Sequence, residues 1–143
     1  MPGTPSQIVP RTRAVAARER IRTRLVALLG RVGGAGSARH FGAERSDDAL
    51  ATGLMDAFRV TRESDVFEGL IEWVRPQLRG RVRARLRRLG AKLDAEEVWQ
   101  DTIVNIYRYP DRFLANRAGA FAAWSSTIAD NVIRRMLRRS RRD

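Results

Sequence analysis

Apolar residues recur every three or four positions along most of the chain from residue 46 onward. This is the spacing of one buried face of an α-helix. Four such stretches are separated by turn signals, and none alternates in the way that a half-buried strand would. The sequence therefore predicts an all-α fold, a bundle of about four helices over residues 46–140.

Polar residues at the expected starts and stops bound these helices. Ser46 is a typical N-cap for the first helix. The pairs Asp65–Glu68 and Asp94–Glu97 have the spacing of capping boxes for the second and third helices. We expect a turn over residues 61–64, a loop over residues 110–118 and a last helix from about residue 119.

The second helix, over residues 67–89, also contains a pattern that is typical of a strand. Its four alternating arginines, Arg81 to Arg87, suggest a strand when taken alone. The apolar period of 3.6 holds over the whole run and favours a helix. Pro76 lies inside this helix and predicts a bend, and Gly90 is expected to end it.

Each predicted helix has an apolar stripe that should face the core. The stripes are, in chain order, Leu50, Leu54 and Phe58; Phe67, Leu70, Val74, Leu78, Val82, Leu86 and Leu89; Ala95, Val98, Trp99, Thr102, Ile103, Ile106 and Tyr107; and Phe121, Trp124, Ile128, Val132 and Met136.

Residues 1–45 differ from the rest in composition, and we separate them from a helical domain at residues 46–143. They are basic and rich in Gly and Pro, which predicts a flexible tail. Residues 1–10 are expected to be disordered, and residues 30–42 to form a linker. Residues 11–29 form at most a basic helix, because their apolar stripe is broken.

The charge balance narrows the function classes. The 143 residues carry a formal net charge of +12, which favours a polyanionic partner. There is no Cys, and His40 is the only His, so neither a disulfide framework nor a thiolate or multi-histidine metal site is expected. No apolar run has the length of a membrane span. We expect no cofactor, no metal and no enzymatic activity.

Two polar surfaces of opposite character stand out. An acidic and amide strip lies on the third helix, and the last helix is crowded with arginine after Asn131, beside a loop with amide and aromatic groups. A basic helix next to such a loop suits phosphates and unstacked bases. Simpler interpretations stay open: first-turn acids and last-turn arginines stabilise helix ends, and Trp124 fits its apolar stripe.

Three segments resemble bacterial sigma factors, especially the small extracytoplasmic-function (ECF) group. Residues 94–108, DAEEVWQDTIVNIYR, resemble the core-binding segment of that family. Residues 121–131, FAAWSSTIADN, resemble its F-x-x-W-L-x-x-I-A-x-N segment. Phe67, Leu70, Trp73, Pro76 and Leu78 match a third pattern upstream. The three occur in the right order on the predicted helices, over about residues 47–142.

The resemblance implies a fold, partners and site residues. It implies the helical module called region 2, which docks on the β′ clamp helices of core RNA polymerase and melts the promoter −10 element, holding non-template bases. The polymerase-binding residues would be Glu96, Glu97, Gln100, Asp101 and Asn105. The DNA-binding residues would be Asn116, Arg117, Trp124, Asn131, Arg134, Arg135, Arg138 and Arg139. A cytoplasmic location and regulation by an anti-sigma factor belong to the same expectation.

The sequence also departs from the family pattern. Ser125 replaces a common Leu, Arg135 a common Asp, and Arg134 an aliphatic residue. Members of the family continue into region 4, which reads the −35 element; the sequence stops at Asp143, so we expect no −35 recognition from it.

Alternative functions remain. The chain would be a generic basic nucleic-acid binder, or a truncated sigma remnant, if polymerase docking is lost. Binding of residues 11–29 to a membrane surface is a further alternative, because that stretch is basic and partly amphipathic.

Overall fold

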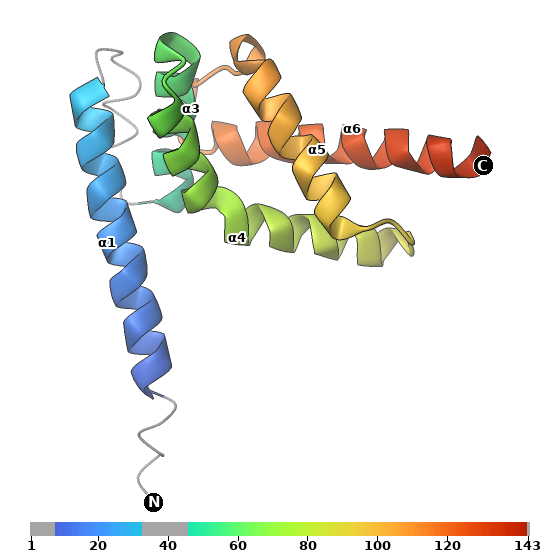
Figure 1. The fold of residues 1–143 in the computed structure, drawn as a ribbon, viewed down its shortest axis with the longest axis horizontal. Coiled ribbons are helices and arrows are strands. Elements are labelled where there is room, and N and C mark those ends of the chain that lie inside the picture. Colours follow the sequence, from blue (N-terminus) through green and yellow to red (C-terminus); the bar gives the residue numbers. More distant parts are fainter. Residues whose placement is uncertain (1–7, 33–45, 143) are drawn as a thin grey trace, which may run out of the picture.

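The computed structural model describes residues 8–32 and 46–142, and every regular element in these ranges is a helix (Figure 1). The predicted all-α fold is confirmed. The elements are α1 (Ile8–Val32), α3 (Asp47–Thr61), α4 (Ser64–Leu89), α5 (Ala95–Arg108), the short 3-10 helix η2 (Pro110–Arg112) and α6 (Ala120–Arg142).

Most predicted helix ends are confirmed. The Ser46 hydroxyl accepts a hydrogen bond from the Ala49 amide at 3.1 Å, and the Asp94 carboxylate accepts one from Glu96 at 2.9 Å. Gly90 ends α4 with φ +60°, in the left-handed region that favours glycine. The capping box at Asp65 is wrong, because the N-cap of α4 is Glu63, two residues earlier, and Asp65 lies within the first turn.

The apolar stripes form two adjoining cores. The first lies among α1, α3, the first half of α4 and the segment that leads into α6, and it contains Leu54, Phe58 and Trp73. The second lies among the end of α4, α5 and α6 around Val82, Val98 and Val132. Two stripe members were predicted wrongly: Leu89 and Tyr107 are exposed, at 46% and 55%.

A bend in α4 connects the two cores. The helix starts alongside α3 and turns away about halfway along its length, so that its second half runs under α5 and α6 (Figure 1). Pro76 lies at this midpoint and cannot donate the usual backbone hydrogen bond. The predicted bend is confirmed, and it brings the arginine-rich end of α4 beside α6.

The expected weak helix in the N-terminal segment is longer than predicted and packs on the first core. Leu25 is 1% exposed and Leu29 is also buried, and both belong to that core. Close packing against α4 occurs at Gly69, where a Cβ atom would lie 2.7 Å from Leu25. Disorder was wrongly predicted for residues 8–10, which lie in α1; residues 1–7 and 33–45 lie outside the described ranges.

Polar contacts explain why a helix with a broken apolar stripe docks. The Arg18 guanidinium lies 3.5 Å from the centre of the Trp73 ring and donates to the Trp73 carbonyl oxygen at 3.0 Å. Arg22 pairs with Asp47 at 2.6 Å, and the Trp73 indole donates to the Asp47 carbonyl oxygen. One tryptophan and one aspartate therefore join α1, α3 and α4.

Candidate functional site

The outer surface of α5 carries the acidic and amide strip. Glu97 and Gln100 are exposed, and Asp101 is half-exposed. Among the described residues, no side chain forms a hydrogen bond or ion pair with the side chains of these three. Glu96, at the edge of the strip, pairs with Arg79 of α4. The strip therefore presents free acceptors to a partner, with the exposed apolar side chain of Val104 among them.

Asn105, one turn after Asp101 on α5, also borders the second predicted surface. Its side-chain amide donates to the Asp101 carbonyl oxygen at 2.8 Å, and it faces a pocket of about 270 Å³ between α5 and α6. The same pocket is lined by Trp124, Asn131 and Arg135, which the sequence analysis assigns to DNA binding. The structure thus brings Asn105 to the second predicted surface.

A second pocket, of about 370 Å³, lies next to the first. Asn116 and Arg117 of the loop line it together with Trp124, Ala123 and Thr127 of α6. Trp124 and Arg112 contribute to both pockets, so they form the wall between them. This pocket therefore brings together Asn116, Arg117 and Trp124, three of the residues that the sequence analysis assigns to DNA binding.

The loop is held by an aromatic cluster. Phe113 is buried, and its ring centre lies 5.2 Å from that of Trp124 and 6.4 Å from that of Phe121. Trp124 is half-buried, so it takes part in the core and still lines the pockets. Leu114 is 70% exposed beside the second pocket. Anchoring at Phe113 leaves the following residues to face solvent.

The arginines of the second half of α6 extend this surface. Asn131 and Arg135 line the first pocket, and Arg139 follows at the same four-residue spacing. Arg134 and Arg138 form a neighbouring row. All five side chains are exposed, and no acid lies among the described residues after Asp130. The arginines that depart from the family pattern therefore lie on the surface and do not disturb the core.

The start of α6 is fixed by side chains from α3. The buried Thr52 hydroxyl donates to the Ala118 carbonyl oxygen at 2.9 Å and accepts from the Phe121 amide at 3.1 Å. Asp48 accepts from the Ala122 amide at 3.3 Å. These bonds satisfy first-turn amides that would otherwise lack partners. α3 therefore sets the position of the loop end and of α6.

Burial raises the pKa of the Asp48 carboxyl above its ordinary value. The hydrogen bond from the Ala122 amide and the positive charge of Arg81 act in the opposite direction, but they are smaller effects. The carboxyl lies in a small pocket with Arg81 and Ser125, between α3, α4 and α6.

Sequence reasoning missed two residues of the site. Arg112 lies 4.4 Å from the centre of the Tyr109 ring, and both line the first pocket. Neither residue is among those that the sequence analysis assigns to DNA binding. The signal in the sequence is an aromatic and a basic residue on either side of Pro110, at the start of the predicted loop.

Within residues 8–32 and 46–142, no three His, Cys, Asp or Glu side chains are grouped closely enough to hold a metal ion. None of the described helices combines the length and apolar character that crossing a bilayer requires.

One comparison with known proteins gives a match. The profile of a protein family described as Sigma-70 region 2 matches residues 70–143, just over half of the 143 residues. The matched part takes in most of α4, all of α5, the loop and α6. Searches of curated proteins and of solved structures give no match.

We expect Thr52→Val to lower the free energy of unfolding by about 1–3 kcal/mol, because it leaves the Phe121 amide and the Ala118 carbonyl without their partner. Urea unfolding measures this change, and hydrogen exchange should show faster exchange of the Phe121 amide. The control is Thr102→Val, since the equally buried Thr102 hydroxyl bonds only within its own helix, to Val98. Equal losses in the two variants would contradict the role of Thr52.

Proposed function

Because this chain belongs to the sigma-70 region 2 family, we propose that it binds core RNA polymerase through α5 and the promoter −10 element through the loop and α6. On the residue patterns at 94–108 and 121–131, we place it in the ECF group of bacterial sigma factors. The proposed role is binding without catalysis, and it is carried out in the cytoplasm, where bacterial polymerase transcribes.

The free acids on α5 support the polymerase-docking half of this proposal. Glu97, Gln100 and Asp101 make no side-chain contacts that docking would have to break. Although the chain has a net charge of +12, this exposed strip is acidic, and it is suited to a basic partner surface. Val104 gives the strip an apolar centre, as the core of a protein interface usually has.

The paired pockets beside Trp124 are the single observation that carries the DNA half. Each hollow has space for a flat aromatic group, and the wall between them combines an indole ring with the guanidinium of Arg112. Bases removed from the stack are held in this way, by stacking and by hydrogen bonds to their edges. Asn105, Asn116 and Asn131 supply amide donors and acceptors around the pockets.

The arginine rows of α6 supply the phosphate contacts. They continue from the first pocket to the end of the helix, so a strand whose bases enter the pockets would have its phosphates near Arg135 and Arg138. Flipping a base costs a few kcal/mol, which such contacts and pocket binding offset. We propose that this surface holds the non-template strand.

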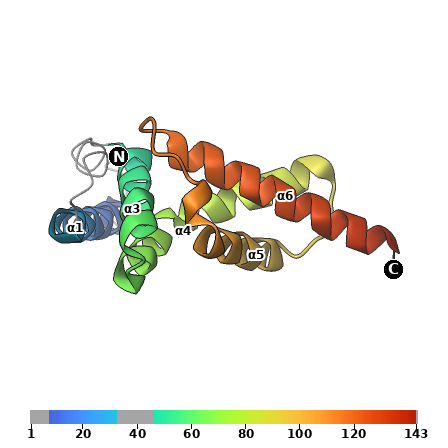
Figure 2. The ribbon, with the colours of Figure 1, turned by 90° about the horizontal axis from the view of Figure 1, so that it is seen from above.

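The two proposed surfaces lie on different helices. When the fold is seen from above, α6 and α5 lie on different sides, and the second half of α4 passes beneath α6 (Figure 2). This arrangement favours a module that connects polymerase to DNA.

A basic nucleic-acid binder without polymerase docking is the second candidate function. The net charge and the surface position of Arg134 and Arg135 favour it, because added positive charge strengthens binding to any phosphate backbone. The two candidates differ only in whether the α5 strip has a partner, so charge reversal on that strip separates them.

We expect Glu97→Arg with Asp101→Arg to abolish co-elution of the protein with bacterial core RNA polymerase in size exclusion. The reversal replaces attraction to a basic surface with repulsion. The matched control is Glu19→Arg with Glu63→Arg, which changes the charge equally at exposed acids on α1 and before α4. Co-elution of the α5 variant at the wild-type level, or loss of co-elution in both variants, would contradict docking through α5.

We expect Arg135→Gln with Arg138→Gln to weaken binding to single-stranded DNA and to make its salt dependence shallower. The slope of log affinity against log salt should fall by roughly 0.7 for each phosphate contact that is lost. Fluorescence anisotropy at several salt concentrations measures it, with Arg13→Gln and Arg20→Gln on α1 as the charge-matched control. An unchanged slope in the α6 variant would be incompatible with phosphate contacts there.

A further inference from the structure

The second half of α4 is strongly basic, and the proposed interface does not use it. Between Glu72 and Asp94 the chain contains no acid. It contains Lys92 and a run of arginines: Arg75, Arg79, Arg81, Arg83, Arg85, Arg87 and Arg88. A solvated helix surface usually carries both positive and negative charges, so this concentration of positive charge indicates an anionic partner.

Three of these arginines line a groove between α4 and α6. Arg81, Arg85 and Arg88 recur at the spacing of one helix face and form one wall of a hollow of about 250 Å³. Its base is apolar, and the polar residues Ser126 and Asp130 of α6 form the other wall. The groove lies on a different face of α6 from the pockets beside Trp124, because the two sets of lining residues do not overlap.

The groove has more positive than negative charge. Asp130 is its single acid and lies 3.2 Å from Arg85, measured from Oδ1 to Nε. Even so, this buried Nε atom has no hydrogen-bond partner. Arg81 and Arg88 are exposed and take part in no ion pair within the described residues, although Arg81 also lies near Asp48 in the neighbouring pocket. Arg88 is therefore left for an anion from solution, and Arg81 lines the groove beside it.

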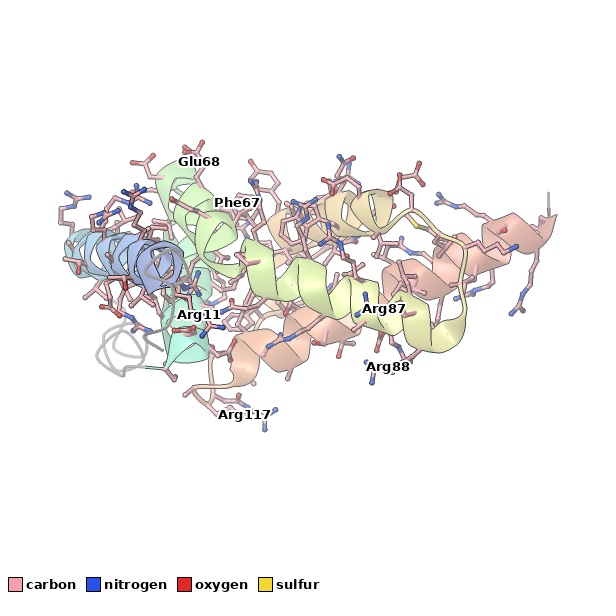
Figure 3. All side chains as sticks on the ribbon, turned by 90° about the horizontal axis from the view of Figure 1, so that it is seen from below. Arg11, Phe67, Glu68, Arg87, Arg88 and Arg117 are labelled. Carbon is pink, nitrogen blue, oxygen red and sulfur yellow. The ribbon has the colours of Figure 1, made fainter. Side chains whose placement is uncertain are left out.

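The spacing of the arginines fits a chain of phosphates. Arg81 and Arg88 are seven residues apart, which is about 10 Å along a helix. Along the axis of a duplex, successive phosphates of one strand rise about 3.4 Å each, so this length covers roughly three of them. One guanidinium group can donate two parallel hydrogen bonds to the oxygens of one phosphate. Arg88 also projects on the same side of the molecule as Arg117 of the proposed DNA surface, away from Glu68 (Figure 3).

We propose that the α4–α6 groove is a second phosphate-binding surface, which takes the sugar–phosphate backbone of a nucleic acid through Arg81 and Arg88. DNA would then contact both sides of α6, its bases at the pockets beside Trp124 and its backbone at the groove. The groove contact requires neither base recognition nor polymerase docking, so it stands or falls independently of the proposed function.

The test compares two variants that lose the same charge from the same helix. Arg81→Gln with Arg88→Gln alters the groove, whereas Arg83→Gln with Arg87→Gln alters exposed arginines that do not line it. Anisotropy titrations at several salt concentrations use a short fluorescent DNA duplex and, separately, one of its strands. For the groove variant, we expect the slope of log affinity against log salt concentration to become shallower. The decrease should be about 0.9 for each lost phosphate contact on the duplex, or about 0.7 on the strand, while the control pair keeps the wild-type slope.

The outcomes decide between duplex and strand, or against the groove. A smaller slope on the duplex alone identifies duplex backbone, and a smaller slope on the strand identifies single-stranded backbone. Equal effects of the two variants, or no effect of either, would overturn the proposal.

Circular dichroism checks folding, and if the double variant fails to fold, Arg88→Gln is compared with Arg87→Gln at the exposed end of α4. Loss of slope here, with none in the Arg135 and Arg138 variant, would retain the groove and reject the α6 interface.

Discussion

The geometry of the whole binding surface depends on the capping of α6 by α3. A helix start needs partners for its first amides, and only the Ala120 amide finds one locally, at the Arg117 carbonyl oxygen. From another helix, Thr52 and Asp48 accept from the next two amides, and Thr52 also donates to the Ala118 carbonyl oxygen at the end of the loop. Because one buried hydroxyl bonds to both sides of the junction, the loop and α6 cannot shift independently of the first core.

This constraint links distant parts of the chain. α3 is joined to α1 and α4 by Asp47 and Trp73, and the bend at Pro76 carries α4 from this first core to the second. Phe113 then inserts beside Phe121 and Trp124, which leaves the following loop residues to face solvent. The pockets beside Trp124 are thus shaped by packing on their inner side and remain polar at their rims.

The distribution of charge gives the molecule its functional asymmetry. Exposed acids lie on α5 and around the start of α4, while the second half of α4 and the end of α6 are almost purely basic. Such a division favours one partner that is basic and one that is rich in phosphate.

Sequence periodicity was sufficient for the helices of residues 46–142, because their apolar stripes are long and their caps at Ser46, Asp94 and Gly90 are local. Periodicity did not predict the features that depend on tertiary contacts. The stripe of α1 is broken, and the helix docks through Leu25 packing on Gly69 and through arginines on Trp73, which no local pattern reveals. Nor does the spacing on α5 show that Asn105 lines a pocket with Asn131, because this depends on how α5 packs on α6.

The central claim is that α5 faces polymerase while the loop faces DNA in one complex. Site-specific photocrosslinking tests it most directly, with a photoreactive residue in place of Gln100 in one variant and of Asn116 in another. Each variant is irradiated in a complex of core polymerase and a −10 promoter fragment. The account predicts that position 100 crosslinks to polymerase and position 116 to the non-template strand. Crosslinks from position 100 to DNA, or from position 116 to polymerase alone, would contradict it.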